Sequence, residues 1–406
     1  MAQNLRKRLQ HIRTVKKNET LSRPQAPSIL DSEWSYVGYQ VYTRVVGMEL
    51  PFPIPQFFSD FLSIIIPDLY YYGSIPNPEA LVFFDLETTG LSGGAGTLAF
   101  LASFGRFKKS RFVVEQYLLL DYPGEGDFVE ALKTEILKPG PAGMPSLIVS
   151  YNGKTFDSQI FKTRCLMNAI VPPEYFHADL LHPSRRLWKH LLSDCSQGTI
   201  ETKILGLDRS GDIPGAMAPE IWFSFLKSGD PSELMGICTH NLRDILGLAA
   251  LILLMDKIAA SPLETLKNFN FDLEALALLW RETFIRQEKG NGKQAEDLLR
   301  VAAERLMPKA LYVYGLDLIK SGEKEKGRHY LNTLASSVPA ADPDMKAAAF
   351  RALAIDAEWR QRDLRKALEY TESALTLHGI KKTSKEALAI RKERLLMKNS
   401  SPEGEK

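Results

Sequence analysis

Residues 81–91 read LVFFDLETTGL, an apolar run that ends in two carboxylates and a glycine turn. The aliphatic and aromatic residues from Leu81 to Phe84 are typical of a buried strand. In a strand, residues i and i+2 point to the same side, so Asp85 and Glu87 are expected to lie together. Two such carboxylates repel each other and lose solvation, which a cation between them would offset. Alternatively, one of them only caps the following turn, and the pair taken alone favours that interpretation.

The composition is that of a soluble globular protein, and a chain of 406 residues is long enough for two or three domains. Lys and Arg total 51 against 49 Asp and Glu, a formal charge of +2 that neither requires nor excludes nucleic acid as a partner. The three cysteines form no Cys-x-x-Cys pair, which is typical of a reducing compartment. The basic N-terminal residues precede no secretory apolar core, and no apolar run is long enough to span a bilayer. We therefore expect a cytoplasmic protein without a membrane partner.

The order of the expected elements predicts an α/β fold. Strands are expected at residues 81–84, 97–107, 111–120, 147–151 and 176–180, and helices at 127–137, near 185–192 and at 236–259. Three strands, a helix and another strand are the order of a ribonuclease-H-like mixed sheet with flanking helices. Residues 33–72, rich in aromatic residues and prolines, are expected to be irregular.

Beyond Pro262 only helices are predicted, and three segments share a small-large-small spacing. These segments are Ala295, Leu299 and Ala302; Gly327, Leu331 and Leu334; and Ala367, Thr371 and Ala374. The copies are 32 and 40 residues apart, so a tetratricopeptide period of about 34 residues is only approximate. A short solenoid of helix pairs and an irregular helical bundle both fit this pattern.

Four segments are therefore expected along the chain. They are a basic flexible arm over residues 1–30, a ribonuclease-H-like domain over 31–260, an all-α tetratricopeptide-like domain over 265–395 and a disordered tail over 396–406. The charges of the arm fit a solvated tail or, alternatively, an arm that binds phosphates.

Two further segments supply partners for the first carboxylates. Asp157 follows an Asn-Gly turn at the end of a predicted strand, where it would either interact with the dipole of the next helix or approach Asp85. At the start of the last long helix, His240 and Asp244 are four residues apart and share one face. A lone histidine is more often structural than catalytic, but convergence with three carboxylates favours a functional role.

The four carboxylates of Asp85, Glu87, Asp157 and Asp244 carry about four negative charges, which two divalent ions would neutralise. Hard oxygen ligands favour Mg²⁺ or Mn²⁺. Two such ions about 4 Å apart can hold a scissile phosphate, so the predicted chemistry is phosphodiester hydrolysis.

These motifs resemble those of the DEDD exonuclease superfamily, and more closely those of the YprB-like predicted exonucleases. The resemblance runs from about Trp34 to the end of the helical repeats. Residues 85–91 resemble the first exonuclease motif, 152–157 the second and 240–244 the third. The resemblance implies that the four carboxylates are metal ligands and that His240 is their catalytic companion.

One spacing departs from the superfamily pattern. In the histidine subgroup the histidine precedes the last aspartate by five residues, whereas His240 precedes Asp244 by four, the spacing of the tyrosine subgroup. Thr239 stands at the five-residue position. His240 is still expected to orient or deprotonate the attacking water, because its ordinary pKa is near neutrality.

Basic and polar side chains near these motifs are candidates for nucleic-acid binding. We assign Asn152, Lys154, Arg185 and Arg186 to this role, and Trp188 could stack on a base. The alternative for the last segment is an amphipathic helix with Trp188 in the core. Residues 179–189 and 212–215 are similar to further YprB-like signatures to which the sequence assigns no role.

Three hypotheses follow. The leading one is a metal-dependent nuclease, by resemblance a 3′-to-5′ exonuclease on single-stranded ends of DNA or RNA, whose repeats recruit a protein partner or extend the nucleic-acid channel. The second is a catalytically silent adaptor that acts through the repeats. The third is a metal hydrolase for small phosphoesters or nucleotides. The intact carboxylate set favours an enzyme, because a purely structural domain gains nothing from such repulsion.

Overall fold

The computed structural model describes residues 30, 32–73, 75–90, 94–287, 292–339 and 341–400. The chain divides into two compact units, residues 1–185 with 192–269 and residues 186–191 with 270–406. Apart from Leu30, the predicted basic arm lies outside the described residues.

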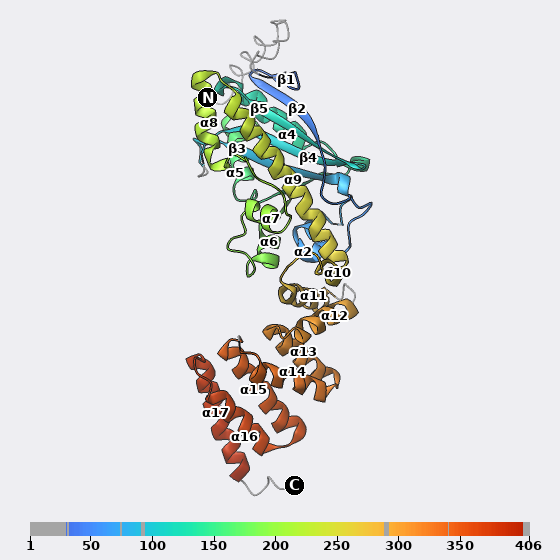
Figure 1. Cartoon of the computed structure of the whole chain (residues 1–406), viewed down its shortest axis with the longest axis vertical. Coiled ribbons are helices and arrows are strands. Elements are labelled where there is room, and N and C mark those ends of the chain that lie inside the picture. Colours follow the sequence, from blue (N-terminus) through green and yellow to red (C-terminus); the bar gives the residue numbers. More distant parts are fainter. Residues whose placement is uncertain are drawn as a thin grey trace, which may run out of the picture. The chain divides into compact units, whose positions relative to one another are not determined.

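The first unit is built on a seven-stranded mixed sheet with the strand order β1-β2-β5-β4-β3-β6-β7 (Figure 1). The strands are β1 Ser35–Gly38, β2 Val41–Met48, β3 Leu81–Thr88, β4 Ala99–Lys108, β5 Arg111–Leu119, β6 Leu147–Ser150 and β7 Phe176–Asp179. The central strand, β3, pairs antiparallel with β4 and parallel with β6. The predicted mixed sheet with flanking helices is therefore confirmed.

The helices between and after these strands are α2 Leu62–Ile65, α3 Asp68–Tyr72, α4 Glu125–Ile136, α5 Asp157–Met167, α6 Leu181–Trp188, α7 Gln197–Lys203, α8 Ala218–Ser228, α9 Ser232–Ala260 and α10 Pro262–Thr265. Of these, α3, α4, α8 and α9 contact strands of the sheet. The long helix α9 packs across β3 and β4 (Figure 1). Gly105 of β4 allows this close approach, because a Cβ there would lie 2.5 Å from a methyl carbon of Ile245.

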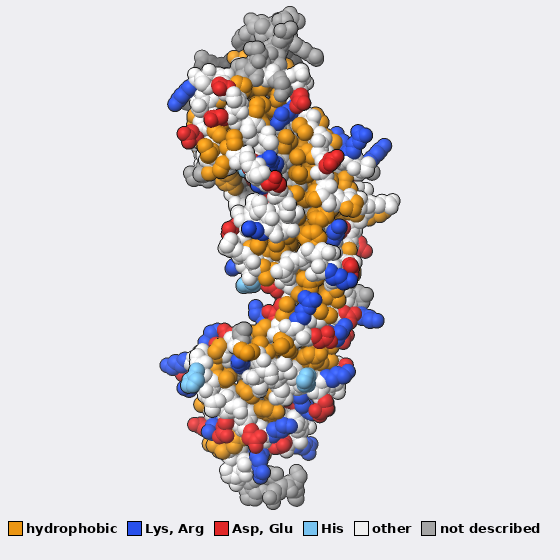
Figure 2. Space-filling view, in the orientation of Figure 1, with side chains coloured by type: hydrophobic (Ala, Val, Ile, Leu, Met, Phe, Trp, Pro, Cys, Tyr) orange, Lys and Arg blue, Asp and Glu red, His pale blue; other side chains and the backbone are white. Residues whose placement is uncertain are grey.

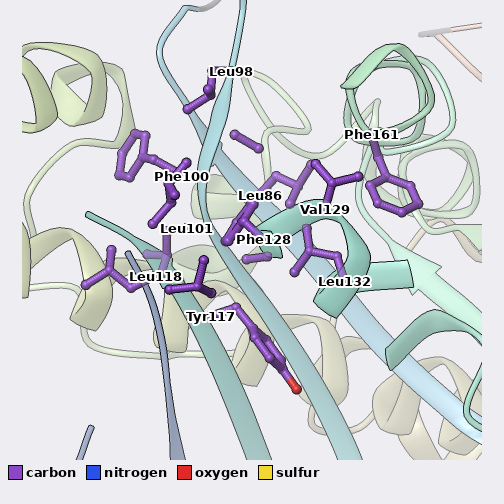
Figure 3. Packing of buried hydrophobic residues seen from close by; sticks show 14 of the residues in the cluster. Leu86, Leu98, Phe100, Leu101, Tyr117, Leu118, Phe128, Val129, Leu132 and Phe161 are labelled. Atoms are coloured by element: carbon purple, nitrogen blue, oxygen red, sulfur yellow. The ribbon is translucent and has the colours of Figure 1, made fainter. Parts of the chain in front are cut away.

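Side chains alternate along β3, so one face of the strand packs in the core and the other carries carboxylates. Leu86 lies in a core that includes Phe128, Val129 and Leu132 of α4 (Figure 3). The opposite face carries Asp85, which meets α9 through Asn241. A well-packed apolar face thus fixes the strand whose other face presents carboxylates.

Two predictions about the first unit are wrong in detail. Residues 35–48 are not irregular but form β1 and β2, which extend the sheet at one edge. Much of β2 is only half-buried, so it lacks the continuous apolar run that marks β3. The helix expected near residues 185–192 begins at Leu181, because Asp179 accepts the backbone N–H of that residue at the helix start.

The second unit is helical after residue 270. Its helices are α11 Leu273–Gln287, α12 Gly292–Glu304, α13 Pro308–Ser321, α14 Lys324–Ser337, α15 Pro343–Asp356, α16 Leu364–Leu375 and α17 Lys382–Ser400. Each of these helices packs against the next along the chain. The tail predicted to be disordered from residue 396 is instead helical as far as Ser400, and residues 401–406 lie outside the described part.

None of the described helices combines the length and the apolar composition needed to cross a bilayer.

Candidate metal centre

A row of polar side chains crosses the sheet beneath α9 and ends at the first carboxylate. Asp85 pairs with Ser103 of β4, and Ser103 pairs with Gln116 of β5. The side-chain carbonyl oxygen of Asn241 accepts hydrogen bonds from Ser103 and, at 3.2 Å, from Gln116. Its amide nitrogen is thereby turned toward Asp85, to which it donates at 2.6 Å. The row fixes the orientation of Asn241 and, through it, of Asp85.

The second carboxylate of β3 meets the third motif. Glu87, His240 and Asp244 each offer a ligand atom, and the three atoms lie within 4.8 Å of one another. Glu87 is 7% exposed, and no described residue donates a hydrogen bond to its carboxylate. A buried carboxylate without a donor is costly, so this arrangement is suited to a cation.

The second motif brings a further carboxylate to the site. Asp157 is buried at the N-terminus of α5. The preceding turn needs glycine for space, since a Cβ on Gly153 would lie 2.3 Å from Ser150 Oγ and 3.0 Å from Asp157 Oδ2. Asp179 holds the turn by accepting the backbone N–H groups of Asn152 at 2.8 Å and Lys154 at 3.1 Å. The sequence assigned no role to Asp179, and the structure shows that its side chain stabilises this turn.

The carboxylates of the three motifs act on one another electrostatically. Burial, followed by the charges of Asp244, Asp157 and Glu87, raises the pKa of Asp85 well above its ordinary value, against the hydrogen bond from Asn241. The pKa of Glu87 is raised well above its ordinary value by burial and then by Asp244 and Asp157. Burial is also the main reason why the pKa of Asp157 rises to about 7. Placing negative charge here is costly without cations, and divalent ions fit the oxygen-rich donor set.

One cation of the chain already lies among these acids. Arg209 forms ion pairs with Asp244 Oδ1 and Glu201, and with Asp212 Oδ2 at 2.8 Å. Glu201 is buried, and burial is the main cause that raises its pKa to about 8. It packs against α9 at Gly247, where a Cβ would collide with its carboxylate. Arg209 therefore ties the loop after α7 to the third motif.

His240 is held from both sides of its ring. Nδ1 lies 2.9 Å from Asp212 Oδ2, and Nε2 lies 3.4 Å from Asp244 Oδ2. Gly215 passes close to the ring, since a Cβ there would lie 3.0 Å from Nε2. The segment 212–215, which the sequence left without a role, thus packs against His240 and hydrogen-bonds it.

The four residues predicted to bind nucleic acid lie in different places: two in the turn of the second motif and two on the exposed side of α6. Lys154 Nζ pairs with Asp68 at 2.6 Å, and Asn152 adopts a positive φ of 62° in the turn. Arg185 and Arg186 are exposed on α6. The base-stacking role of Trp188 is wrong, because this side chain is fully buried and donates a hydrogen bond to the carbonyl of Asn270 at 2.9 Å. The core alternative is confirmed for this residue.

The visible surface carries both signs of charge. On the face shown in Figure 2, Lys and Arg side chains are interspersed with Asp and Glu. This mixture agrees with the nearly neutral composition, so any binding of polyanions would depend on local groups such as Arg185.

Sequence reasoning missed three side chains that organise the site: Glu201, Arg209 and Asn241. Asn241 lies inside the third motif, and its neighbours at the i−1 and i+3 positions were both selected. The available signal was that Asn241 lies on the same predicted helix as His240 and Asp244. Glu201 and Arg209 lie outside every motif and gave no signal, because their contacts with α9, at Gly247 and Asp244, join residues more than thirty positions apart.

Comparison with known proteins bears on the fold of this domain. Residues 82–258 match the family model described as the RNase_H superfamily. The uncharacterized protein YprB of Bacillus subtilis (strain 168) is 42% identical over 184 residues, which make up 45% of this chain and 43% of that protein. The chain thus matches less than half the length of this curated relative. The sheet and the family match together show a ribonuclease-H-like domain.

A solved structure gives a weaker similarity. The family B DNA polymerase from the hyperthermophilic archaeon Pyrobaculum calidifontis aligns with 78% of this chain and 50% of its own, with 14% sequence identity and a TM-score of 0.34.

Proposed function

We propose that this protein is a divalent-metal-dependent nuclease that hydrolyses phosphodiester bonds of DNA or RNA. The observation that carries the proposal is the convergence of Glu87, His240 and Asp244 within 4.8 Å. The charges of Asp85 and Asp157 act on the same group of residues. The nucleases of the ribonuclease-H-like superfamily supply the reaction class, and the match over residues 82–258 supports its transfer to this chain.

The four carboxylates Asp85, Glu87, Asp157 and Asp244 would hold two ions, Mg²⁺ or Mn²⁺. Bound there, the ions would supply Lewis-acid activation of the phosphate and of the attacking water. The chain itself contributes the orientation of these ligands. Asn241 holds Asp85 at 2.6 Å, and Arg209 holds Asp244 by one oxygen. The other oxygen, Asp244 Oδ2, lies 3.4 Å from His240 Nε2.

We further propose 3′-to-5′ exonuclease activity on single-stranded ends. The order of the three motifs supports this direction through the resemblance to DEDD exonucleases. Arg185 and Arg186, exposed on α6, would contact the phosphates of the strand, and Asn152 and Lys154 would line its path near Asp157.

The second unit is proposed to contain tetratricopeptide-like repeats that bind a protein partner or extend the path of the nucleic acid. The three small-large-small segments fall on α12, α14 and α16, and all their side chains are buried. Gly327 of α14 packs closely on α13, since a Cβ there would lie 2.5 Å from the carbonyl oxygen of Gly315. Close packing at the small position supports stacked helix pairs.

The proposed function is tested by digestion of single-stranded DNA and RNA oligonucleotides labelled at the 5′ end, with Mg²⁺ or Mn²⁺. We expect a metal-dependent ladder of products shortened from the 3′ end, abolished by EDTA and by Asp85→Asn. Asp60→Asn, which removes an exposed carboxylate outside the site, is the matched control and should retain full activity.

Other outcomes separate the alternatives. Full cleavage by Asp85→Asn would refute the assignment of the site. Hydrolysis of small phosphodiesters such as bis(p-nitrophenyl) phosphate without cleavage of either polymer would instead identify a small-molecule hydrolase. Internal cleavage of circular single strands would contradict the exonuclease direction while keeping the nuclease.

A further inference from the structure

We propose that Nε2 of His240 is itself a metal ligand and that the site it shares with Glu87 and Asp244 takes a divalent transition-metal ion of the class of Mn²⁺ in preference to Mg²⁺. This inference deepens the proposed nuclease function and rests on it. It changes the role of His240 from a base that acts on water to a donor that selects the metal.

The separation of the donor atoms supports a shared ion. His240 Nε2 and Asp244 Oδ2 are 3.4 Å apart. One ligand atom from each of Glu87, His240 and Asp244 lies within 4.8 Å of the other two. Two donors that each lie about 2.1 Å from one ion are about 3.0–3.4 Å apart when the angle between them is about 90–110°. The spacing of four residues on α9 places both side chains on the same face of the helix.

The partner of the other ring nitrogen sets the tautomer. Nδ1 lies 2.9 Å from Asp212 Oδ2, a carboxylate that can only accept, so Nδ1 carries the proton and donates it. Arg209 Nη1 lies 3.4 Å from Nδ1 and could only donate to it, but this Nη1 already donates to Asp212 Oδ2 at 2.8 Å, and the contact of Nδ1 with the same oxygen is shorter than its contact with Nη1. In the neutral ring the lone pair is then on Nε2, directed toward Asp244. A carboxylate behind the far nitrogen is the usual support of a metal-ligating histidine.

Glu87 supplies an independent observation. Its carboxylate is nine-tenths buried, points into the same group and receives no hydrogen bond from any residue that the structure describes. A donor-free carboxylate in such a place calls for a cation. Arg209 lowers the pKa of Glu87 through its charge, but burial and the neighbouring carboxylates still leave that pKa well above its ordinary value. The ion pairs of Arg209 are instead with Asp244 Oδ1, Glu201 and Asp212.

The donor set decides which metal is preferred. Imidazole nitrogen suits transition metals, whereas Mg²⁺ favours oxygen donors and retains its waters. One nitrogen with two carboxylates therefore favours Mn²⁺ over Mg²⁺ at this site. A nitrogen whose lone pair is directed to an ion cannot also accept a proton from water, so the general-base role predicted from sequence is replaced.

The test is pulsed electron paramagnetic resonance of the full chain with Mn²⁺ as the only added metal. We expect echo modulation from one directly bound ¹⁴N nucleus, which changes to the ¹⁵N pattern when the histidines are labelled with ¹⁵N. His240→Asn should remove the modulation. His182→Asn, at an exposed histidine of α6, is the matched control and should retain it.

Asp212→Asn tests the positioning role of the carboxylate behind Nδ1. We expect the nitrogen modulation to persist while the dissociation constant for Mn²⁺ rises about 10- to 100-fold, measured by titration calorimetry. Circular dichroism of each metal-free variant reports whether it folds. The ¹⁵N labelling of the unmodified chain needs no variant and still shows whether the ion binds a histidine if His240→Asn does not fold, and unchanged modulation in the unlabelled and labelled proteins would overturn the assignment.

The outcomes distinguish this inference from the nuclease assignment. Bound Mn²⁺ without nitrogen modulation would overturn the role of His240, and the nuclease assignment would stand if oligonucleotides were still cleaved. Modulation without cleavage of any nucleic acid would support His240 as a ligand and overturn the nuclease. Failure to bind Mn²⁺ at millimolar concentration would overturn the ligand assignment.

Discussion

The side-chain amide of Asn241 donates a hydrogen bond to Asp85 Oδ2 across 2.6 Å. This contact joins the central strand to the long helix that carries the third motif. The carbonyl oxygen of the same amide accepts hydrogen bonds from Ser103 and Gln116. One neutral side chain therefore orients a carboxylate whose pKa burial and neighbouring charges raise.

Replacement of this amide by a carboxylate tests its importance. Asn241→Asp removes the donor to Asp85 and adds a charge beside it, so we expect the metal-free protein to lose roughly 1–3 kcal/mol of unfolding free energy. Urea denaturation in EDTA measures the loss, which Mn²⁺ should reduce. Asn268→Asp, at an exposed asparagine, should change stability little. Equal effects of the two substitutions would contradict the special role of Asn241.

The buried ion pairs of Arg209 lead to a second prediction. Arg209→Gln leaves Glu201 and Asp244 without their cation, and we expect a loss of about 3–5 kcal/mol in unfolding free energy. Glu201→Gln added to this variant should recover part of the loss, because it removes one of the uncompensated charges. A double-mutant cycle in urea measures the coupling, and strictly additive effects would show that the pair does not interact.

The sequence predicted the centre of the sheet well because its signals are local. The apolar run of β3 is buried along its length, and carboxylates follow that run at the spacing of a strand. The helix that carries His240 and Asp244 was likewise predicted, since its spacing places both residues on one face. Patterns of two and four residues are physical consequences of strand and helix geometry, and they can be read without a tertiary structure.

The missed features depend on contacts that no local pattern encodes. The half-buried β2 shows only a weak alternation and becomes a strand by pairing with β5, about seventy residues further along. Arg209 belongs to no recognisable sequence motif, and its place in the site depends on its ion pairs with acidic residues on α7 and α9. Trp188 illustrates the opposite error, since an aromatic residue between basic ones resembles a binding surface until its burial is known.

The turn of the second motif gives a third prediction. A methyl group on Gly153 would meet Ser150 Oγ at 2.3 Å and Asp157 Oδ2 at 3.0 Å. We therefore expect Gly153→Ala to destabilise the protein by about 1–3 kcal/mol and to displace Asp157, with at least a tenfold loss of the proposed nuclease activity. Gly198→Ala on α7, where the added methyl group meets open space, should leave both properties unchanged. Full activity of Gly153→Ala would contradict the role of this turn.

The exposed arginines of α6 give a fourth prediction, on nucleic-acid affinity. If Arg185 and Arg186 each contact one phosphate, the double substitution to Gln should weaken binding to single strands. It should also lower the slope of log K against log salt by about 1.4, about 0.7 for each contact. Fluorescence anisotropy with Ca²⁺ in place of Mg²⁺ measures both quantities. Lys326→Gln, at an exposed lysine of α14, is the control, and an unchanged salt slope would remove the phosphate role.

Titration of the carboxylates predicts how stability depends on pH. Burial is the main cause that raises the pKa of Asp157 from 3.8 to about 7. In the unfolded chain this group titrates near its ordinary value, so between about pH 4 and 7 the folded state binds more protons. The contribution of Asp157 to the unfolding free energy is therefore present at low pH and is lost as the pH rises through 7. The raised pKa values of Asp85 and Glu87 act in the same direction.

Comparison with Asp157→Asn isolates this contribution. His177, whose pKa burial lowers from 6.5 to about 4, acts in the opposite direction below pH 6.5, so the wild-type curve alone is not diagnostic. In EDTA, we expect the wild type to lose roughly 1–3 kcal/mol more than Asp157→Asn between pH 4 and pH 8, measured by urea denaturation. Mn²⁺ should restore stability to the wild type at pH 8 more than at pH 4, because ions bind the ionised carboxylates. Parallel pH curves for the two proteins in EDTA would show that Asp157 is not protonated in the fold near neutrality.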